Sequence, residues 1–377
     1  MTEELNNNYC VIMAGGIGSR FWPRSNKKLP KQFLDILGTG RTLLQTTYER
    51  FVRFIPKDHI FVVTNADYRD LVMEQLPGIT AANVLCEPTY RNTAPAVTWA
   101  ACHLRALNPD ACMVVTPTDQ CILDEERFAE AIGRGLDYVA HADRLLTVGI
   151  HADRPDTNFG YIQVDERLAR DIYRVKSFTE KPEMEFARFF VESGEFYWNS
   201  GLFLWNANVF LRTMLRIVPD PDLVPEVAEL IDGKLPAEAF LANEQPYVNR
   251  FYATLPNMSL EYGVLERSEC VDVLIGDFGW RDIGSWSTLY EMVPKDHEQN
   301  VVLDTRALLY DCRDNLVSVP DGHVVVLKDL EGYMVVEEHG VLIICRRDDA
   351  AAIRQFRNDV QVKMGRSTSD GGRLPDA

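Results

Sequence analysis

Short apolar runs alternate with segments of helical periodicity through the first 150 residues of the chain. The helical segments cover residues 42–54, 67–76, 93–107 (with Thr93 as its cap) and 125–141, and the apolar runs cover residues 9–13, 59–64, 83–86, 111–116 and 145–150. Buried strands that alternate with helices of about 10–15 residues are typical of a parallel sheet covered on both faces. The pattern therefore predicts an α/β fold with a mostly parallel sheet.

The pattern changes after residue 160. Residues 161–164 and 175–179 are expected to form strands of an added sheet, and the acidic, proline-containing stretch 219–236 a helical excursion. The α/β unit is expected to close near Tyr290. Five short runs with glycine turns then predict a small all-β unit, at residues 307–310, 316–319, 323–327, 333–337 and 341–345.

A closing helix is expected at residues 350–360, followed by a polar tail rich in Gly, Ser and Asp. We therefore predict a large α/β domain over residues 1–290, a small β domain with its closing helix over 291–362, and a disordered tail over 363–377.

Composition narrows the class of protein. The chain has 377 residues, 46% of them hydrophobic, and a formal net charge of −17, which argues against a dedicated nucleic-acid binder. Its eight cysteines form no CxxC pair, and no HExxH motif occurs, so a structural zinc site is not expected. The first residues lack a signal-peptide pattern, and no run approaches the roughly 18 apolar residues of a membrane helix. We expect a cytoplasmic protein without a membrane anchor.

A glycine-rich loop, Ala14-Gly15-Gly16-Ile17-Gly18-Ser19-Arg20, directly follows the first predicted strand. Ligands of open α/β sheets bind at the carboxyl ends of strands, and glycines let backbone N–H groups approach phosphate oxygens. The loop is not a dinucleotide fingerprint, because Phe21 occupies the third glycine position, and no Gly-Lys-Ser/Thr follows as in a Walker A motif. The loop therefore predicts a nucleoside triphosphate site of another kind.

A basic arm follows the loop. Residues 20–31 contain five cations and no acid, namely Arg20, Arg24, Lys27, Lys28 and Lys31, in a chain that is acidic overall. Such a cluster can neutralise a triphosphate. The alternative, a plain glycine turn with a solvated basic loop, is less consistent with this charge pattern.

Four later segments place polar residues where a ligand site is plausible. Asn92 and Thr93 open a predicted helix, where they can cap it, bind a nucleotide, or do both. Asp119 ends an apolar strand and is either a turn residue or a ligand. Glu180 and Lys181 precede a proline, where a solvated strand end is the alternative. Asn199 lies in an apolar segment and needs hydrogen-bond partners, either a sugar hydroxyl or a backbone turn.

The sequences of these segments resemble those of one protein family. Residues 15–25, GGIGSRFWPRS, followed by 29–34, LPKQFL, are similar to the signature of the sugar-phosphate nucleotidyltransferases, and most of all to mannose-1-phosphate guanylyltransferases. Residues 87–96, 116–120, 159–162, 178–182, 196–203, 259–266 and 278–286 resemble further family segments in the same order. Three positions depart from the family spelling: Thr118, Gln120, where the family usually has His, and Glu261, where it has Asp.

The resemblance implies a role for each matching residue. Gly15, Gly16 and Gly18 would cradle the triphosphate, with Arg20 on the leaving pyrophosphate and Lys31 on the α-phosphate. Glu87, Asn92 and Thr93 would bind the nucleotide. Gly160, Tyr161, Glu180 and Asn199 would bind the sugar, and Lys181 its phosphate. Asp119 and Asp282 would be the ligands of Mg²⁺.

The implied reaction joins GTP and mannose 1-phosphate to give GDP-mannose and diphosphate, in a homodimer whose β domain is a short left-handed β-helix. The alternatives are another sugar or base, such as heptose or fucose 1-phosphate or a uridylyl or thymidylyl donor, and a non-catalytic regulatory relative. Too little chain follows Trp286 for an added isomerase domain with its metal-binding histidines.

Overall fold

The computed structural model describes residues 7–16, 18–217, 225–254, 256–303, 305–320 and 322–363. The tail predicted to be disordered lies outside these residues, apart from Lys363. The chain divides into two compact units, one of residues 1–15 and 47–280 and the other of residues 16–46 and 281–377. The two units are described separately below.

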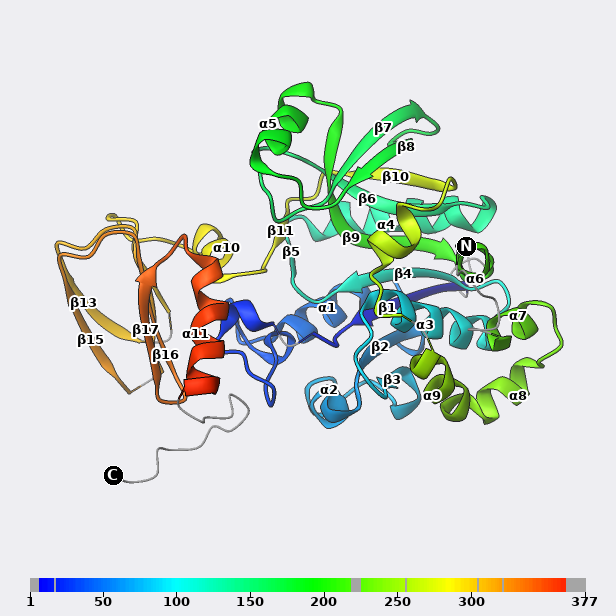
Figure 1. The fold of residues 1–377 in the computed structure, drawn as a ribbon, viewed down its shortest axis with the longest axis horizontal. Coiled ribbons are helices and arrows are strands. Elements are labelled where there is room, and N and C mark those ends of the chain that lie inside the picture. The colour runs from blue at the N-terminus through cyan, green and yellow to red at the C-terminus, as the bar shows by residue number, and fades with distance from the viewer. Residues whose placement is uncertain are drawn as a thin grey trace. The chain divides into compact units, whose positions relative to one another are not determined.

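The first unit contains the elements that alternate in the first half of the chain (Figure 1). Its strands are β1 (Asn8–Met13), β2 (Ile60–Asn65), β3 (Val84–Glu87), β4 (Cys112–Pro117), β5 (Gln120–Ile122), β6 (Leu145–His151), β7 (Tyr161–Arg167), β8 (Ile172–Thr179), β9 (Phe196–Asn206) and β10 (Val271–Gly276). Its helices are α1 (Leu43–Val52), α2 (Arg69–Gln75), α3 (Thr93–Leu107), α4 (Glu125–His141), α5 (Met184–Ser193), α6 (Ala207–Ile217), α7 (Pro225–Ile231), α8 (Ala237–Ala242) and α9 (Glu244–Thr254).

Nine strands form one mixed sheet in the order β3-β2-β1-β4-β9-β6-β10-β8-β7, and β9 also pairs with β7. Strands β3, β2, β1 and β4 are parallel, as are β6 and β10. Strand β9, which the apolar pattern does not predict, runs antiparallel between β4 and β6. The α/β class is thus confirmed. The sheet is mixed rather than mostly parallel, because the pairings of β9 with β4, β6 and β7 and of β8 with β7 and β10 are antiparallel. The separate sheet expected for β7 and β8 is wrong, because β10 pairs with β8 and β9 pairs with β7.

Helices α3 and α4 begin and end at the predicted residues. The N-cap of α4 is Asp124, whose carboxylate accepts a hydrogen bond from the Arg127 N–H at 3.0 Å. The N-cap of α3 is Asn92 rather than Thr93, and Pro95 is accommodated in the first turn, where its missing N–H has no helical partner to lose.

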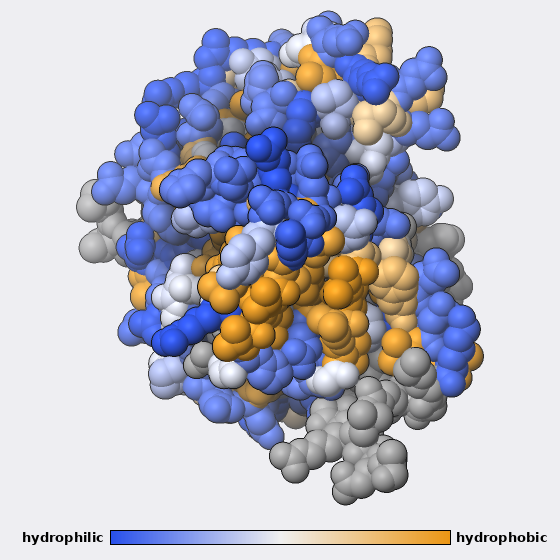
Figure 2. All heavy atoms as spheres, turned by 90° about the vertical axis from the view of Figure 1, so that its left-hand side faces the viewer, coloured by the Kyte–Doolittle hydropathy of each residue, from blue (hydrophilic) through white to orange (hydrophobic). Residues whose placement is uncertain are grey.

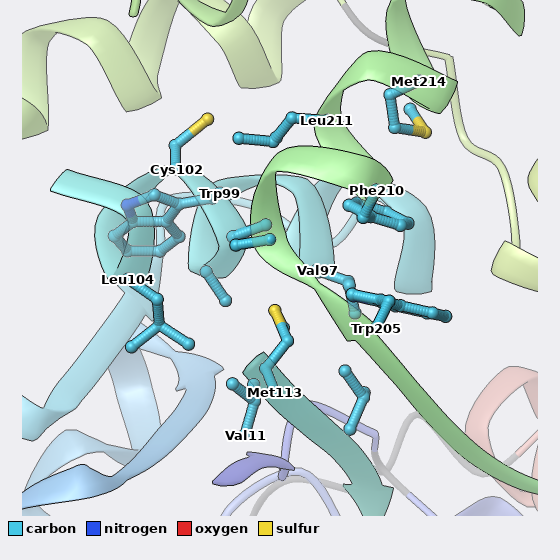
Figure 3. Packing of buried hydrophobic residues seen from close by; sticks show 14 of the residues in the cluster. Val11, Val97, Trp99, Cys102, Leu104, Met113, Trp205, Phe210, Leu211 and Met214 are labelled. Atoms are coloured by element: carbon cyan, nitrogen blue, oxygen red, sulfur yellow. The ribbon is translucent and has the colours of Figure 1, made fainter. Parts of the chain in front are cut away.

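Helix α3 is buried on almost every side because it is packed between the sheet and other helices. Figure 3 shows Val11 and Met113 of the sheet on one side of the helix and Phe210, Leu211 and Met214 of α6 on another. The rings of Trp205 and Phe210 stack beside it, with centroids 4.6 Å apart. This core fixes the carboxyl ends of β1, β3 and β4 at one edge of the sheet, where the glycine-rich loop, Glu87 and Asp119 follow.

The second unit combines the basic arm with the C-terminal strands. Its elements are the 3₁₀ turns η2 (Ser19–Phe21) and η3 (Lys31–Phe33), the strands β11 (Trp280–Asp282), β12 (Val301–Leu303), β13 (Arg306–Tyr310), β14 (Leu316–Ser318), β15 (Val324–Lys328), β16 (Tyr333–Glu338) and β17 (Val341–Arg346), and the helices α10 (Trp286–Met292) and α11 (Ala350–Lys363). The five predicted C-terminal strands and the closing helix are confirmed.

The C-terminal strands pair in two small sheets with a repeating register. Strands β12, β14 and β16 are parallel, β13 and β15 form a separate parallel pair, and β17 closes on β16 in the antiparallel sense. An offset of 18 residues relates Arg306 to Val324, Arg313 to Glu331 and Leu316 to Met334. An aliphatic cluster forms the core of these strands, namely Val317, Val319 and Val335, with Ala307, Leu309, Val325, Leu327 and Leu330 packed against them. In the described residues of both units, no helix is long and apolar enough to cross a membrane.

Candidate active site

Gly18 of the glycine-rich loop and Lys31 lie together in the second unit. Gly18 has φ of 67°, in the left-handed region that favours glycine, and a Cβ atom placed on it would lie 2.6 Å from the Lys31 Cβ atom. The Ser25 hydroxyl donates to the Gly18 carbonyl at 2.5 Å. The aliphatic stem of Lys31 therefore packs on the loop itself, which fixes the point from which its ammonium group extends.

The basic arm is anchored by aromatic residues. The Phe21 ring meets the Trp286 ring edge-on at 5.3 Å, and the Trp286 indole N–H donates to the Trp22 carbonyl at 3.3 Å. The Arg24 guanidinium donates to the Asp35 carbonyl at 2.9 Å and so holds the arm to the following segment. Lys27 and Lys28 are exposed. In the arm, Arg24 is thus anchored by a hydrogen bond and Lys31 packs on the loop, whereas Lys27 and Lys28 are exposed to solvent.

Arg20 and Asp282 meet at Gly284, also in the second unit. A Cβ atom on Gly284 would collide with Asp282 Oδ2 and would lie 3.2 Å from Arg20 Nη1 and 3.3 Å from Arg20 Nη2. The two residues are far apart in sequence, and the family resemblance assigns them to the pyrophosphate and the metal. The Arg20 guanidinium and the Asp282 carboxylate both lie against the α-carbon of Gly284, and a side chain at position 284 would take the space that they occupy.

In the first unit, Asp119 lies between β4 and β5 and is partly buried. The neighbouring Gln120 is buried, and its amide donates to the Ser200 carbonyl of β9 at 2.5 Å. The residue that departs from the family spelling therefore ties the Asp119 loop to the centre of the sheet. Within the described residues, no group of three or more His, Cys, Asp or Glu is placed to hold a metal ion. Mg²⁺ does not need such a cage, since it typically takes one or two carboxylates together with substrate phosphates and water.

Glu87 ends β3 and faces the start of the glycine-rich loop. It is 3% exposed, and a Cβ atom on Gly15 would lie 2.9 Å from its Oε2 atom. Burial raises the pKa of Glu87 to about 7, although a hydrogen bond from Tyr252 opposes the shift. A carboxyl group at the rim of the loop therefore changes its charge near neutral pH.

Asn92 and Thr93 hold the turn that follows. Asn92 has φ of 70°, which is costly for a residue other than glycine, and its side chain caps α3 by accepting from the Thr93 N–H at 2.9 Å. The Thr93 hydroxyl accepts from the Leu260 N–H at 2.9 Å, and the Ala94 N–H donates to the Met258 carbonyl at 3.1 Å. Both residues thus shape the loop, and direct contact with a nucleotide stays a prediction.

The residues assigned to the sugar gather around Gly160. A Cβ atom there would lie 2.6 Å from Glu180 Oε2 and 3.6 Å from Asn199 Cβ. Lys181 has φ of 45° and donates to Glu180 Oε1 at 2.5 Å. The Asn199 side-chain oxygen accepts from the Thr147 hydroxyl at 3.0 Å and from the Gly201 N–H at 3.3 Å, and a sugar contact by Asn199 stays a prediction. The buried Tyr161 hydroxyl bonds to the Asp156 backbone, so a sugar contact by Tyr161 would use its main chain.

Glu261 belongs to the same neighbourhood, and the sequence alone gives it no role. It begins the π-helical turn η8 (Glu261–Leu265), a geometry that is frequent at functional sites. Desolvation raises the pKa of Glu261, a backbone hydrogen bond opposes the shift, and the charge of Glu180 raises the pKa further. The sequence signal that could have pointed to Glu261 is the resemblance of residues 259–266 to a family segment. The family has Asp where this chain has Glu261, which weakens that signal.

Comparison with known proteins identifies the family. The model for the nucleotidyl transferase family, described as "Nucleotidyl transferase", matches residues 9–299. The chain belongs to this family, and it is an enzyme of that class.

Relatives are similar over most of their length. The chain is 38% identical over 369 residues to a mannose-1-phosphate guanylyltransferase of Escherichia coli K12, covering 94% of this chain and 73% of that protein. It is 33% identical over 359 residues to the mannose-1-phosphate guanylyltransferase RfbM of Salmonella typhimurium, covering 93% and 72%. A solved structure from Thermus thermophilus, described as a mannose-1-phosphate geranyltransferase, is 29% identical, covers 94% of this chain and 100% of that one, and has a TM-score of 0.81.

Gly284→Ala tests the crowded contact of Arg20 and Asp282. The added methyl group must displace the Asp282 carboxylate, so we expect kcat for nucleotidyl transfer to fall at least about 100-fold, as when a reacting group is misplaced by about 1 Å. Gly133→Ala is the matched control, since a Cβ atom there meets nothing within 4 Å and the residue lies within α4. Wild-type kcat in Gly284→Ala would contradict the role of this contact.

Proposed function

We propose that this chain is a mannose-1-phosphate guanylyltransferase, which transfers GMP from GTP to α-D-mannose 1-phosphate and releases diphosphate. The observation that carries the proposal is the cluster of Gly160, Glu180, Lys181 and Asn199 in a nucleotidyl transferase, because it combines polar groups suited to sugar hydroxyls with a cation suited to a phosphate. Relatives 33% and 38% identical over more than nine-tenths of this chain bear that name. The free thiols fit a reducing compartment, since no disulfide links the eight cysteines, and we propose a cytoplasmic site of action.

The chemistry requires two anions to meet. The sugar phosphate is already an anionic nucleophile, so no general base is needed, and catalysis consists of positioning and charge neutralisation. We assign Lys181 to the nucleophilic phosphate, which it reaches from a backbone held by its own positive φ and its bond to Glu180. Lys31, braced on Gly18, neutralises the α-phosphate, and Arg20 stabilises the leaving pyrophosphate. Backbone N–H groups of Gly15, Gly16 and Gly18 bind the triphosphate.

Asp119 and Asp282 are the proposed ligands of Mg²⁺. Both are carboxylates, the donor type that Mg²⁺ prefers, and each follows or ends a strand. When bound, the ion neutralises phosphate charge and orients the phosphates. Arg20 lies against the same glycine as Asp282, so it can share the neutralisation of the leaving group.

A pyrophosphate-release assay tests the function directly. We expect turnover with GTP and mannose 1-phosphate to exceed that of every other pair by at least about 10-fold in kcat/KM, because the base and the sugar each make contacts that the alternatives lack. The panel crosses GTP, ATP, UTP and dTTP with mannose, glucose, fucose and heptose 1-phosphates. Preference for another pair would replace this assignment within the family, and no turnover of any pair would favour a regulatory protein.

Asp119→Asn and Asp282→Asn test the metal ligands. Each change keeps the side-chain shape but removes the negative charge, so we expect Mg²⁺-dependent kcat to fall at least about 100-fold, since metal coordination supplies several kcal/mol of charge stabilisation. Asp277→Asn is the control, because the Asp277 side chain is 96% exposed. Thermal unfolding should be unchanged in all three variants. Near-normal activity in either site variant would remove that residue from the metal site.

We also propose that the protein is a homodimer formed through the C-terminal strands. Large apolar side chains point outward from β13, β15 and β17, namely Leu308, Tyr310, Val324, Val326, Leu342 and Ile344, each at least 52% exposed. Figure 2 shows an apolar patch on the face that carries these strands. A parallel strand pair such as β13–β15 is rarely left open on an apolar face, which favours a second copy as its cover.

The parallel registers favour the β-helix that the family resemblance implies. The offset of 18 residues recurs on the β14–β16 pair, the β13–β15 pair and the Arg313–Glu331 bridge, as it would on three faces of one coil. We propose that the coil is left-handed, as in the family.

Val326→Asp tests the dimer. Burying an unpaired carboxylate in an apolar interface costs several kcal/mol, so the dimer dissociation constant should rise at least about 30-fold. Val362→Asp on α11 is the control, because Val362 is equally apolar and 81% exposed. Light scattering during gel filtration, over a range of concentrations, measures the mass. A wild-type monomer, or a variant that dimerises normally, would contradict this interface.

A further inference from the structure

Helix α9 is fastened to α3 by polar contacts in an otherwise apolar region. At its first residue, the Glu244 carboxylate accepts from the Trp99 indole N–H at 2.7 Å and lies 2.8 Å from His103 Nδ1. Two turns further on, the Tyr252 ring meets the Trp99 ring edge-on, with centroids 6.2 Å apart. These contacts fix the position of Tyr252, in a segment that matches no motif.

The Tyr252 hydroxyl points to the end of β3. It donates a hydrogen bond to Glu87 Oε1 at 3.0 Å, and the two residues are 1% and 3% exposed. Residues 165 positions apart are thereby joined in a buried pair. The hydroxyl is the donor, so this hydrogen bond directs one carboxylate oxygen toward Tyr252 and thereby restrains the orientation of the Glu87 side chain.

The second oxygen of Glu87 faces the start of the glycine-rich loop, since Oε2 lies 2.9 Å from the position that a Cβ atom on Gly15 would take. An ionised carboxylate only accepts hydrogen bonds, so it repels phosphate oxygens and attracts N–H and O–H donors. A nucleoside offers such donors on its base and its ribose. The glycine at position 15 leaves room for that contact.

We propose that Tyr252 is a positioning residue of the nucleotide site, which orients the ionised Glu87 carboxylate so that Oε2 accepts a hydrogen bond from a nucleoside donor. This inference rests on the proposed guanylyltransferase function. The hydroxyl of Tyr252 does not itself touch the nucleotide.

Nucleotide binding then depends on pH. Burial raises the pKa of Glu87 to about 7, and the hydrogen bond from Tyr252 lowers it, so loss of the hydroxyl raises it further. Burial also raises the pKa of Tyr252, and the charge of Glu87 adds to that shift, so the hydroxyl stays a donor. Tyr90 lies near the same carboxyl: desolvation raises the pKa of Tyr90, and the charge of Glu87 raises it further. GTP affinity is therefore full above the Glu87 pKa and falls as pH drops through it.

Tyr252→Phe tests the inference. The misoriented Glu87 carboxylate should lose its hydrogen bond with the nucleoside. We therefore expect KM and the calorimetric Kd for GTP to rise roughly 10-fold to 100-fold near neutral pH, the range for losing a hydrogen bond to a charged group, while kcat at saturation is kept. The pH at which affinity is half lost should move upward. Tyr247→Phe, on the same helix, is the matched control and should change neither.

A second variant and two analogues sharpen the test. Glu87→Gln cannot ionise, so its GTP affinity should be weak and independent of pH. Inosine triphosphate lacks the exocyclic amine of guanine and 2′-deoxy-GTP lacks one ribose hydroxyl; the analogue that wild type binds weakly, but Glu87→Gln binds as it binds GTP, identifies the donor.

Two results would overturn the inference: a Tyr252→Phe protein with wild-type GTP affinity at every pH, or one whose affinity falls without any shift of the pH profile, which indicates packing alone. Binding is measured without a sugar phosphate, so failure of the proposed function is distinguishable. A wild-type protein that binds GTP but does not turn it over with mannose 1-phosphate refutes the function and still tests Tyr252.

Discussion

The candidate site depends on charged side chains that lie directly against glycine α-carbons. At four glycines an added Cβ atom would lie within 2.9 Å of such a side chain: Gly15 with Glu87, Gly18 with Lys31, Gly160 with Glu180, and Gly284 with Asp282. Atoms of proteins do not approach so closely without displacement, so the Glu87, Glu180 and Asp282 carboxylates and the aliphatic stem of Lys31 occupy volume that a larger residue than glycine would take. The positions of these charges are therefore set by the backbone of the partner segment and not by the free rotation of a long side chain.

This arrangement suits a reaction whose rate depends mainly on electrostatic stabilisation of the transition state. Stabilisation of developing charge is effective when the donors and cations are already in place and need not reorganise. Lys31 has its stem held on the loop that it serves, and Lys181 starts from a backbone fixed at positive φ. Tyr252 holds the Glu87 side chain in place by a hydrogen bond. Burial raises the pKa of Glu87 and disfavours the charge, whereas the same bond favours the ionised carboxylate. Packing, backbone conformation or a hydrogen bond thus restricts the motion of the Lys31, Lys181 and Glu87 side chains.

Much of the fold follows from local pattern, and the exceptions are non-local. The bounds of α3 and α4 agree with their periodicity and capping residues, and the C-terminal strands agree with their glycine turns. Strand β9 is not predicted as a strand because its partners, β4 and β6, are separated from it in sequence, and nothing in its spelling indicates an antiparallel strand within a parallel region. The same reason explains why the pattern assigns β7 and β8 to another sheet: their pairing with β9 and β10 is a tertiary fact.

The site shows the same division between motif and tertiary contact. Residues carried by a motif can be named from the sequence. The hydrogen bonds of Tyr252 to Glu87 and of Gln120 to Ser200 join segments far apart in sequence, and no local pattern encodes them. The three glycines of the loop also differ in how closely other side chains approach their α-carbons, which the sequence does not reveal. A Cβ atom on Gly16 would meet nothing within 4 Å, whereas Gly15 and Gly18 are covered by Glu87 and Lys31. Gly16 therefore has an open α-carbon face. Gly15 leaves room for the Glu87 carboxylate, and Gly18 leaves room for the stem of Lys31 and adopts a positive φ, so each glycine has its own spatial reason besides any contact of its N–H group with phosphate.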